Sequence, residues 1–306
     1  MRYGDVILER SKDPTIFADV VKELRLKPPV IIKPNWGTIN NYTEAQVLDH
    51  VLSAINGEAV VTESYGWARA EDALKGMGPG SMRREALRMS DEWFLKSSGV
   101  GEVLKKHGAE YVNVTEEVWN KRTVDPETVR EAASKYPQVA TKEFYARVPQ
   151  RLYDLHKGTF LSLAKYRLNH DPICFSLTLK NFFGMIPGPG RAKYHGLNDE
   201  KLSRSIVDIN VVYRSIFNVK GMVEGFYTAS RGKTVEQAIN PEVAKNRGVV
   251  LGSENGVMID AFVAAMEGRD PATVDYINEA SKVFGGWDKR DVEAAQKCGV
   301  SIWKGK

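Results

Sequence analysis

The sequence predicts an α/β protein of two lobes, with mainly parallel sheets and a cleft between the lobes. Short β-branched apolar runs alternate with segments of helical periodicity, and this alternation occurs in both halves of the 306-residue chain. The apolar runs are continuous, which is typical of parallel strands covered by helices on both faces. The length exceeds that of one usual domain, so we expect lobes at residues 1–158 and 159–306.

In the first half, short apolar runs are separated by segments with an apolar stripe. The run at 29–33 is β-branched and followed by Pro34, which favours a buried strand. In the expected helix at 43–55, Thr43 is a suitable N-cap. The other expected strands are at 5–8, 59–63 and 109–114, and the other helices at 14–24 and 100–107. Polar residues 115–136 indicate an insertion or a surface helix, and alternation at 141–148 indicates an antiparallel edge strand.

The second half repeats this order of elements. We expect strands at 159–163, 173–179, 219–226 and 248–252, and helices at 202–216, 257–266, 272–284 and 291–298.

Composition limits the class of protein. The 43 basic and 39 acidic residues give a net charge of +4 without a basic arm, which disfavours nucleic acid and suits a small anionic ligand. The two cysteines, Cys174 and Cys298, exclude a disulfide framework and an iron–sulfur cluster held by this chain alone. No apolar run reaches the roughly 18 residues of a membrane span. We therefore expect a cytoplasmic protein that does not enter the membrane.

Polar residues follow several of the expected strands. There are four such groups: Lys33 with Asn35, Glu63, Lys165 with Arg167 and His170, and Lys180 with Asn181. Ligands of open α/β sheets bind beyond the carboxyl ends of the strands. Solvated strand ends are the alternative interpretation of each pattern. Together these residues predict a basic site in which an anion offsets the repulsion between lysines.

A loop rich in glycine and proline follows Asn181 and ends in Lys193, Tyr194 and His195. Such a loop can hold a fixed shape close to a ligand, although most Gly/Pro clusters are turns. His195 is the best candidate for acid–base chemistry, or for binding a metal ion if one is used. Asp260 is either a site acid or an acid favoured by a helix N-terminus. Metal-ligand spacings and the common nucleotide-binding motifs are absent from the sequence.

Several of these segments together resemble the bacterial and archaeal family known as domain of unknown function 362. The resemblance is carried by residues 31–35, 61–64, 163–170, 179–184, 194–195, 248–252 and 259–268. The Lys-Asn-x-x-Gly element at 180–184 is its most specific part. Where the family often has Asp-Gly, this chain has Glu224 and Gly225, and the ferredoxin-like cysteines of some members are absent.

The order of Lys180, Pro187, Gly188 and His195 also resembles that of nickel-pincer lactate racemases. That resemblance implies that Lys180 anchors an organic cofactor and that His195, 15 positions later, binds nickel. The paired catalytic histidines of the racemases are not found in this chain, so the likeness concerns the two-lobe architecture.

Two functions fit these patterns best. The first is an enzyme, isomerase-like or metal-assisted, that acts on a small carboxylate or phosphate. In that hypothesis Lys33, Lys165 and Lys180 neutralise the anion, and His195 transfers a proton with Glu63 or Asp260 as its carboxylate partner. The other residues expected to bind substrate are Asn35, Arg167, His170, Asn181 and Lys193. The second is a carrier that holds an anion or an organometallic cofactor without turnover, and a subunit that docks an acidic partner is a third possibility.

Overall fold

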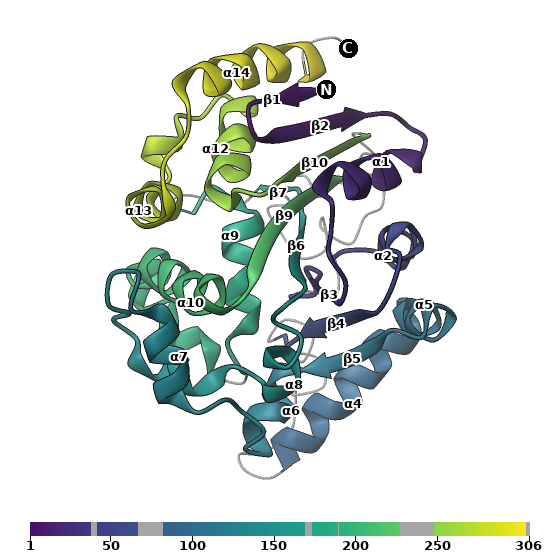
Figure 1. The fold of residues 1–306 in the computed structure, drawn as a ribbon, viewed down its shortest axis with the longest axis vertical. Coiled ribbons are helices and arrows are strands. Elements are labelled where there is room, and N and C mark those ends of the chain that lie inside the picture. Colours follow the sequence, from purple (N-terminus) through teal and green to yellow (C-terminus); the bar gives the residue numbers. More distant parts are fainter. Residues whose placement is uncertain (38–41, 67–81, 169–172, 189, 227–247, 304–306) are drawn as a thin grey trace.

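A mixed eight-stranded sheet lies at the centre of the molecule (Figure 1). The computed structural model describes residues 1–37, 42–66, 82–168, 173–188, 190–226 and 248–303. In spatial order the strands are β1 (Arg2–Tyr3), β2 (Val6–Arg10), β10 (Val249–Ser253), β9 (Asn218–Gly225), β6 (Thr159–Lys165), β3 (Val30–Lys33), β4 (Ala59–Glu63) and β5 (Glu110–Asn113).

The five strands from β9 to β5 are parallel, so their carboxyl ends meet at the same edge of the sheet. The predicted α/β class with a mostly parallel sheet is therefore confirmed. The remaining pairings, β9 with β10, β10 with β2 and β2 with β1, are antiparallel.

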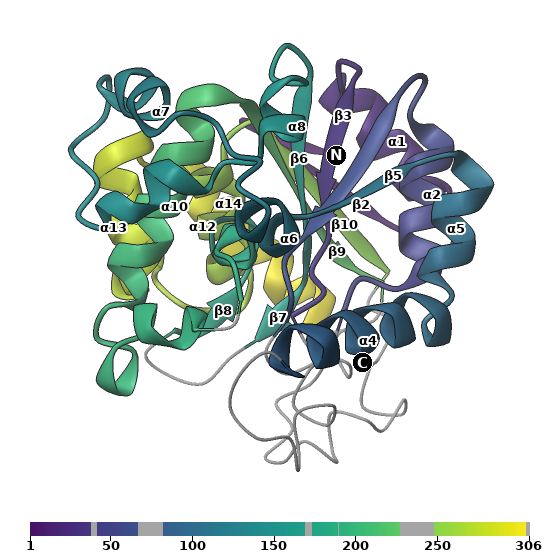
Figure 2. The same cartoon turned by 90° about the horizontal axis from the view of Figure 1, so that it is seen from below.

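Helices cover both faces of the sheet (Figure 2), because its strands carry apolar side chains on both sides. Ile31 packs in one apolar layer, while its neighbours Val30 and Ile32 pack in the other. One layer contains α1 (Thr15–Leu24), α2 (Ala45–Ala54), α4 (Met82–Ser97) and α5 (Val100–His107). The other contains α7 (Pro126–Ala133), α10 (Leu202–Ile216), α12 (Gly256–Met266), α13 (Asp275–Phe284) and α14 (Lys289–Trp303). The shorter helices are α6 (Val114–Trp119) and α8 (Gln150–Tyr153).

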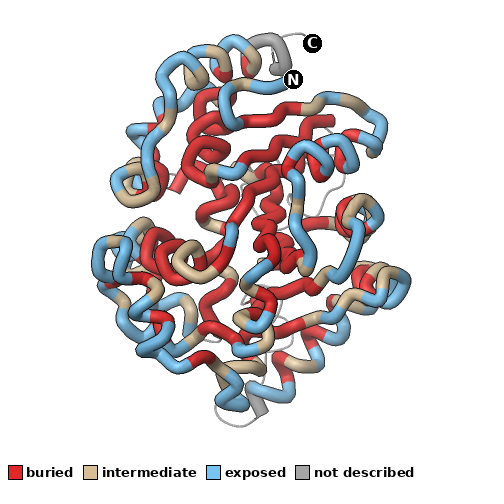
Figure 3. The backbone as a smooth tube through the Cα atoms, viewed as in Figure 1, coloured by how far each residue is buried: buried red, intermediate tan, exposed pale blue. Residues whose placement is uncertain are grey.

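Burial is concentrated in the central strands and in α12 (Figure 3). All eleven residues of α12, Gly256–Met266, are buried, which agrees with its almost wholly apolar sequence. None of the helices in the described ranges is long and apolar enough to cross a membrane.

The sheet crosses the expected lobe boundary at residue 158. Strand β6 pairs with β3, and β10 pairs with β2, so strands from both halves form one sheet. The boundary and the cleft between lobes stay predictions.

Three local predictions were wrong. Residues 142–147 form a 3₁₀ helix, with Phe144 and Tyr145 both buried, where we expected an edge strand. Glu44 rather than Thr43 is the N-cap residue of α2, because the Thr43 hydroxyl accepts from the backbone N–H of Asn35 (2.9 Å).

The third wrong prediction concerns the expected strand at 173–179. Its middle forms β8 (Phe175–Ser176), which pairs only with β7 (Arg167–Leu168), and its end enters the short helix α9 (Thr178–Asn181). The chain turns before β8 at Cys174, whose φ of 57° lies in the left-handed region. Lys180 and Asn181 therefore lie on a helix and not at the end of a sheet strand.

Candidate functional site

Two pairs of oppositely charged residues lie at the carboxyl ends of four parallel strands. Lys33 ends β3 and Glu63 ends the adjacent β4, while Lys165 of β6 lies opposite Glu224 of β9. Both pairs are almost completely buried. A buried charge needs a partner, and in each case the neighbouring strand supplies one.

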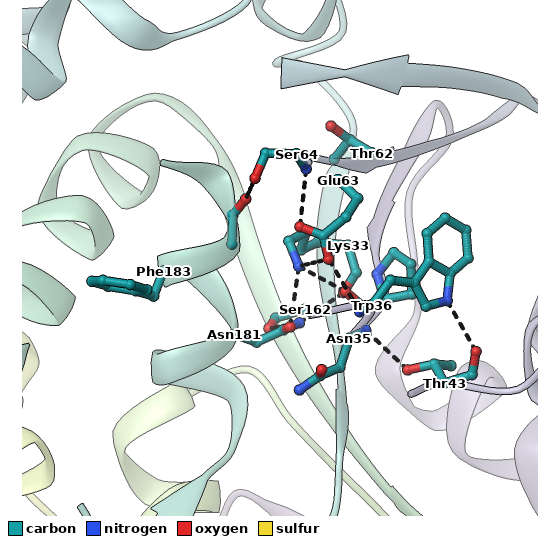
Figure 4. A network of polar contacts seen from close by, with 12 residues as sticks. Lys33, Asn35, Trp36, Thr43, Thr62, Glu63, Ser64, Ser162, Asn181 and Phe183 are labelled. Atoms are coloured by element: carbon teal, nitrogen blue, oxygen red, sulfur yellow. Dashed lines mark hydrogen bonds and ion pairs between the residues drawn. The ribbon is translucent and has the colours of Figure 1, made fainter. Parts of the chain in front are cut away.

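Lys33 is the centre of the first buried network (Figure 4). Its Nζ lies 2.7 Å from Glu63 Oε2 and donates to the Pro34 carbonyl (2.7 Å) and to Asn181 Oδ1 (3.2 Å). The amide of Asn181 in turn donates to the Lys33 carbonyl (2.8 Å) and to Ser162 Oγ (3.1 Å). The structure therefore brings together three predicted site residues, but it uses them to join α9 to the sheet.

Gly184 packs directly on this ion pair. A Cβ atom at Gly184 would lie 2.6 Å from Lys33 Nζ and 2.7 Å from Glu63 Oε1, so a larger residue would displace the pair. The Ser64 hydroxyl donates to the Gly184 carbonyl (2.5 Å) and accepts from Arg191 Nη1 (3.0 Å). These contacts fix the glycine- and proline-containing loop to the end of β4.

Lys165 is held between two carboxylates. Its Nζ lies 2.6 Å from Glu44 Oε2 and 3.0 Å from Glu224 Oε1. Burial raises the pKa of Glu224 to about 8, although the charge of Lys165 opposes this rise. Because both acids come from this chain, the contacts favour a structural role for Lys165, and anion binding by Lys165 stays a prediction.

We expect Glu224 to make stability depend on pH. The pKa of Glu224 is higher in the folded chain than the ordinary 4.5. Its contribution to the free energy of unfolding is therefore present below pH 4.5 and is lost as the pH rises to about 8. Between pH 5 and pH 8 this loss should be on the order of 2 kcal/mol in the parent. Urea unfolding at the two pH values should show a smaller loss in Glu224→Gln. Glu254→Gln is the control, because the pKa of Glu254 is lowered by Lys220 and lies below this window. If the free energy of unfolding falls equally between pH 5 and pH 8 in Glu224→Gln and in the parent, Glu224 is not the group responsible.

Asp260 caps the helix that carries Lys180. Its carboxylate accepts from the backbone N–H groups of Thr178 (2.9 Å) and Leu179 (3.0 Å) and from the Thr178 hydroxyl (2.6 Å). Burial raises the pKa of Asp260 to about 7, and these hydrogen bonds oppose the rise. Of the two roles left open by the sequence, these contacts support a helix-capping role, at α9 and not at α12.

Lys180 and Arg167 form a second cationic group, which differs from the buried lysines. Neither side chain makes a hydrogen bond or ion pair with the residues that the structure describes, and both are partly exposed. Burial, and then the charge of Arg167, lower the pKa of Lys180 to about 8. Burial also lowers the pKa of Arg167. Two neighbouring cations without a bound acid form a suitable place for an anion.

His195 lies beside this group and is paired with Asp199. Its Nδ1 is 2.5 Å from Asp199 Oδ1, and its ring meets Phe183 edge-on at 4.9 Å between centroids. Lys180 Nζ lies 5.8 Å from the centre of the same Phe183 ring. Burial, followed by the charge of Lys180, lowers the pKa of His195 although Asp199 opposes the change. The imidazole is therefore largely neutral at pH 7.

The turn that brings Asp199 to His195 has an unusual backbone. Asn198 and Asp199 have φ angles of 54° and 64°, and Gly196 has 74°, all in the left-handed region. Such angles cost of order 1 kcal/mol for residues other than glycine and are found at functional sites. Asp199 is not among the residues predicted for the site, although its spacing of four residues from His195 is visible in the sequence.

A pocket of about 130 Å³ opens next to His195. It is lined by Tyr65, Leu87, Gly188, Gly190, Arg191, Ala192 and His195. Arg191, also missed in the sequence, donates to the Tyr65 carbonyl (3.2 Å) and so joins the loop to β4. This volume has room for a ligand of a few heavy atoms.

The other predicted site residues lie elsewhere. Lys193 is exposed, and its Nζ lies 3.0 Å from Glu143 Oε1, which raises the pKa of Lys193. Asn35 is buried near Thr43, beside the Lys33 network (Figure 4). His170 lies outside the described residues. Among the described residues, no group of three or more His, Cys, Asp or Glu side chains could hold a metal ion, so His195 as a metal ligand stays a prediction.

Residues 30–265, from β3 to within α12, match the family model described as a domain of unknown function, DUF362. The chain belongs to the DUF362 family. The resemblance inferred from the Lys-Asn-x-x-Gly element is thereby confirmed, and the whole of the site described above lies within the matched part of this DUF362 chain. No curated protein and no solved structure matches the chain. The likeness to lactate racemases stays a prediction.

Proposed function

We propose that the chain is an enzyme acting on a small carboxylate or phosphate, which Arg167 and Lys180 bind and to which His195 transfers a proton. The observation that carries this proposal is the contrast between two sets of cations. Glu63 lies 2.7 Å from Lys33 and Glu44 lies 2.6 Å from Lys165, so acids of the chain neutralise both lysines. Lys180 and Arg167 have no such acid among the described residues, and an anion would relieve the repulsion between them.

The pair of His195 and Asp199 supplies the acid–base chemistry. Asp199 accepts a hydrogen bond from Nδ1–H, which orients the imidazole and leaves Nε2 available to the substrate. Since burial keeps the imidazole neutral, Nε2 can accept a proton, and Asp199 then stabilises the imidazolium. The cations Arg167 and Lys180 stabilise the negative charge that develops on the substrate.

The anion-binding part of this proposal predicts the effect of Arg167→Met. This change keeps the apolar stem and removes the guanidinium, so binding of oxalate and of inorganic phosphate should weaken about tenfold or more. Isothermal titration calorimetry at pH 7 measures both affinities directly.

Lys193→Met is the matched control for this experiment. It also removes one positive charge, but from a surface ion pair with Glu143. We expect its affinities to equal those of the parent. If Arg167→Met binds both probes as tightly as the parent, or if the two variants lose affinity equally, the assigned anion site is wrong.

A further inference from the structure

Lys180 has the surroundings of an amine nucleophile. It occupies α9, whose N-terminus is fixed by Asp260 and whose Leu179 carbonyl accepts from Asn210 Nδ2 at 2.8 Å. Its side chain extends over the Phe183 ring and is not held by a carboxylate of the described residues. The backbone position is therefore fixed by these contacts, while no carboxylate of the described residues pairs with the amine.

Burial and the charge of Arg167 also prepare the amine of Lys180. With a pKa of about 8, roughly a tenth of the Lys180 side chains carry a free amine at pH 7. Nearby cations and burial are the means by which proteins prepare lysine for attack on carbonyl groups. Arg167 supplies the nearby cation, and Phe183 supplies part of the apolar surroundings.

We propose that the substrate carries a carbonyl group beside its acid group, and that Lys180 Nζ condenses with this carbonyl to form an imine. This inference rests on the proposed function, because Arg167 holds the acid group while Lys180 reacts. The Nζ lone pair forms a bond to the carbonyl carbon, and one of the two Nζ protons passes to the carbonyl oxygen. The resulting hydroxyl takes up the second Nζ proton and leaves as water, which yields the C=N bond.

His195 is placed to serve the proton transfers of this step. It contacts the same phenyl ring as Lys180, and Asp199 orients its imidazole. Its Nε2 accepts the proton that Nζ loses on attack and returns one to the departing hydroxyl. The condensation consumes no oxidant or reductant and releases one water.

Reductive trapping tests this inference on the full chain. Glyoxylate, an aldehyde with a carboxylate, is added with cyanoborohydride, which reduces an imine to a stable carboxymethyl amine. Intact mass should rise by one glyoxylic acid less one oxygen atom, and peptide mapping should place the label on Lys180. At pH 7 labelling of Lys180 should be at least about tenfold faster than that of Lys193. A label spread evenly over the exposed lysines, or an equal yield in Lys180→Arg, would overturn the inference.

Two controls separate this inference from the proposed function. Acetaldehyde has the carbonyl without the acid group, so it should not favour Lys180 to the same extent. Arg167→Met should abolish the preference for glyoxylate and shift the pH at which labelling rises to a higher value, because Arg167 lowers the pKa of Lys180. If oxalate and phosphate bind through Arg167 but glyoxylate does not label Lys180, the imine is refuted and the anion site stands. If neither oxalate nor phosphate binds and glyoxylate does not label Lys180, the anion site and the imine are both refuted.

Discussion

Replacing Lys33 with methionine is expected to lower the free energy of unfolding by about 3 to 5 kcal/mol. Glu63 is 2% exposed, and Lys33 provides the cation at 2.7 Å from its Oε2. Without Lys33, the described residues offer the carboxylate only the hydrogen bonds from the backbone N–H groups of Trp36 (3.1 Å) and Ser64 (3.0 Å). Urea unfolding at pH 7 measures the loss.

Two variants make this prediction specific. In the double variant Lys33→Met with Glu63→Gln, no buried charge remains at this place, so much of the lost stability should return. Arg122→Met removes an exposed partner of Glu117 and should cost less than about 1 kcal/mol. A Lys33→Met protein as stable as Arg122→Met would show that the buried pair contributes nothing specific.

Asp260→Ala is expected to lower the free energy of unfolding by about 3 kcal/mol and to weaken anion binding. The change removes the acceptor of three hydrogen bonds and leaves the N–H groups of Thr178 and Leu179 buried without a partner. Because α9 carries Lys180, loss of its cap also disturbs the cationic group. Urea unfolding and titration with oxalate measure the two effects.

Asp260→Asn is the conservative comparison. It retains the shape and one acceptor oxygen, so we expect about half the loss of stability. Faster hydrogen exchange at the Thr178 and Leu179 amides should appear in both variants. Unchanged exchange at these two amides would refute the capping role, even if the protein were destabilised.

Most of the regular fold could be predicted from the sequence because local patterns decide it. The β-branched runs at 30–33 and 59–63 form strands, and the apolar stripe at 202–216 forms a helix with those bounds. The mostly parallel sheet follows from the continuous apolar character of these runs. The local sequence does not indicate that β10 pairs antiparallel with its neighbours, since its five residues are also buried and mostly apolar.

The errors arise where a distant residue decides the local structure. Residues 176–179 alternate as a strand would, but Asp260 supplies the acceptors that start a helix at Thr178. The alternation expected at 141–148 is interrupted by the consecutive residues Phe144 and Tyr145, which both turn inward, and Glu143 accepts from the Tyr194 hydroxyl. Periodicity cannot report such long-range hydrogen bonds.

The candidate site was predicted in part. The sequence selected Lys180, Arg167 and His195, and in the structure the charge of Arg167 lowers the pKa of Lys180 while that of Lys180 lowers the pKa of His195. That these three residues form a functional site stays a prediction. It also selected Lys33 and Lys165, whose neutralisation by Glu63, Glu44 and Glu224 depends on which strands are neighbours. Strand order is a property of the tertiary fold, so the sequence could not distinguish the two kinds of lysine.

The position of β10 inside the sheet has a consequence for biosynthesis. Val249 of β10 pairs with Arg10 on one side and with Gly225 on the other. While the ribosome has yet to deliver β10, the nascent polypeptide presents an open edge on β2 and another on β9. Open edges invite pairing with other chains. During translation the hydrogen bonds between β2 and β9 through β10 therefore form late. Until then, the incomplete molecule is exposed to pairing with other chains.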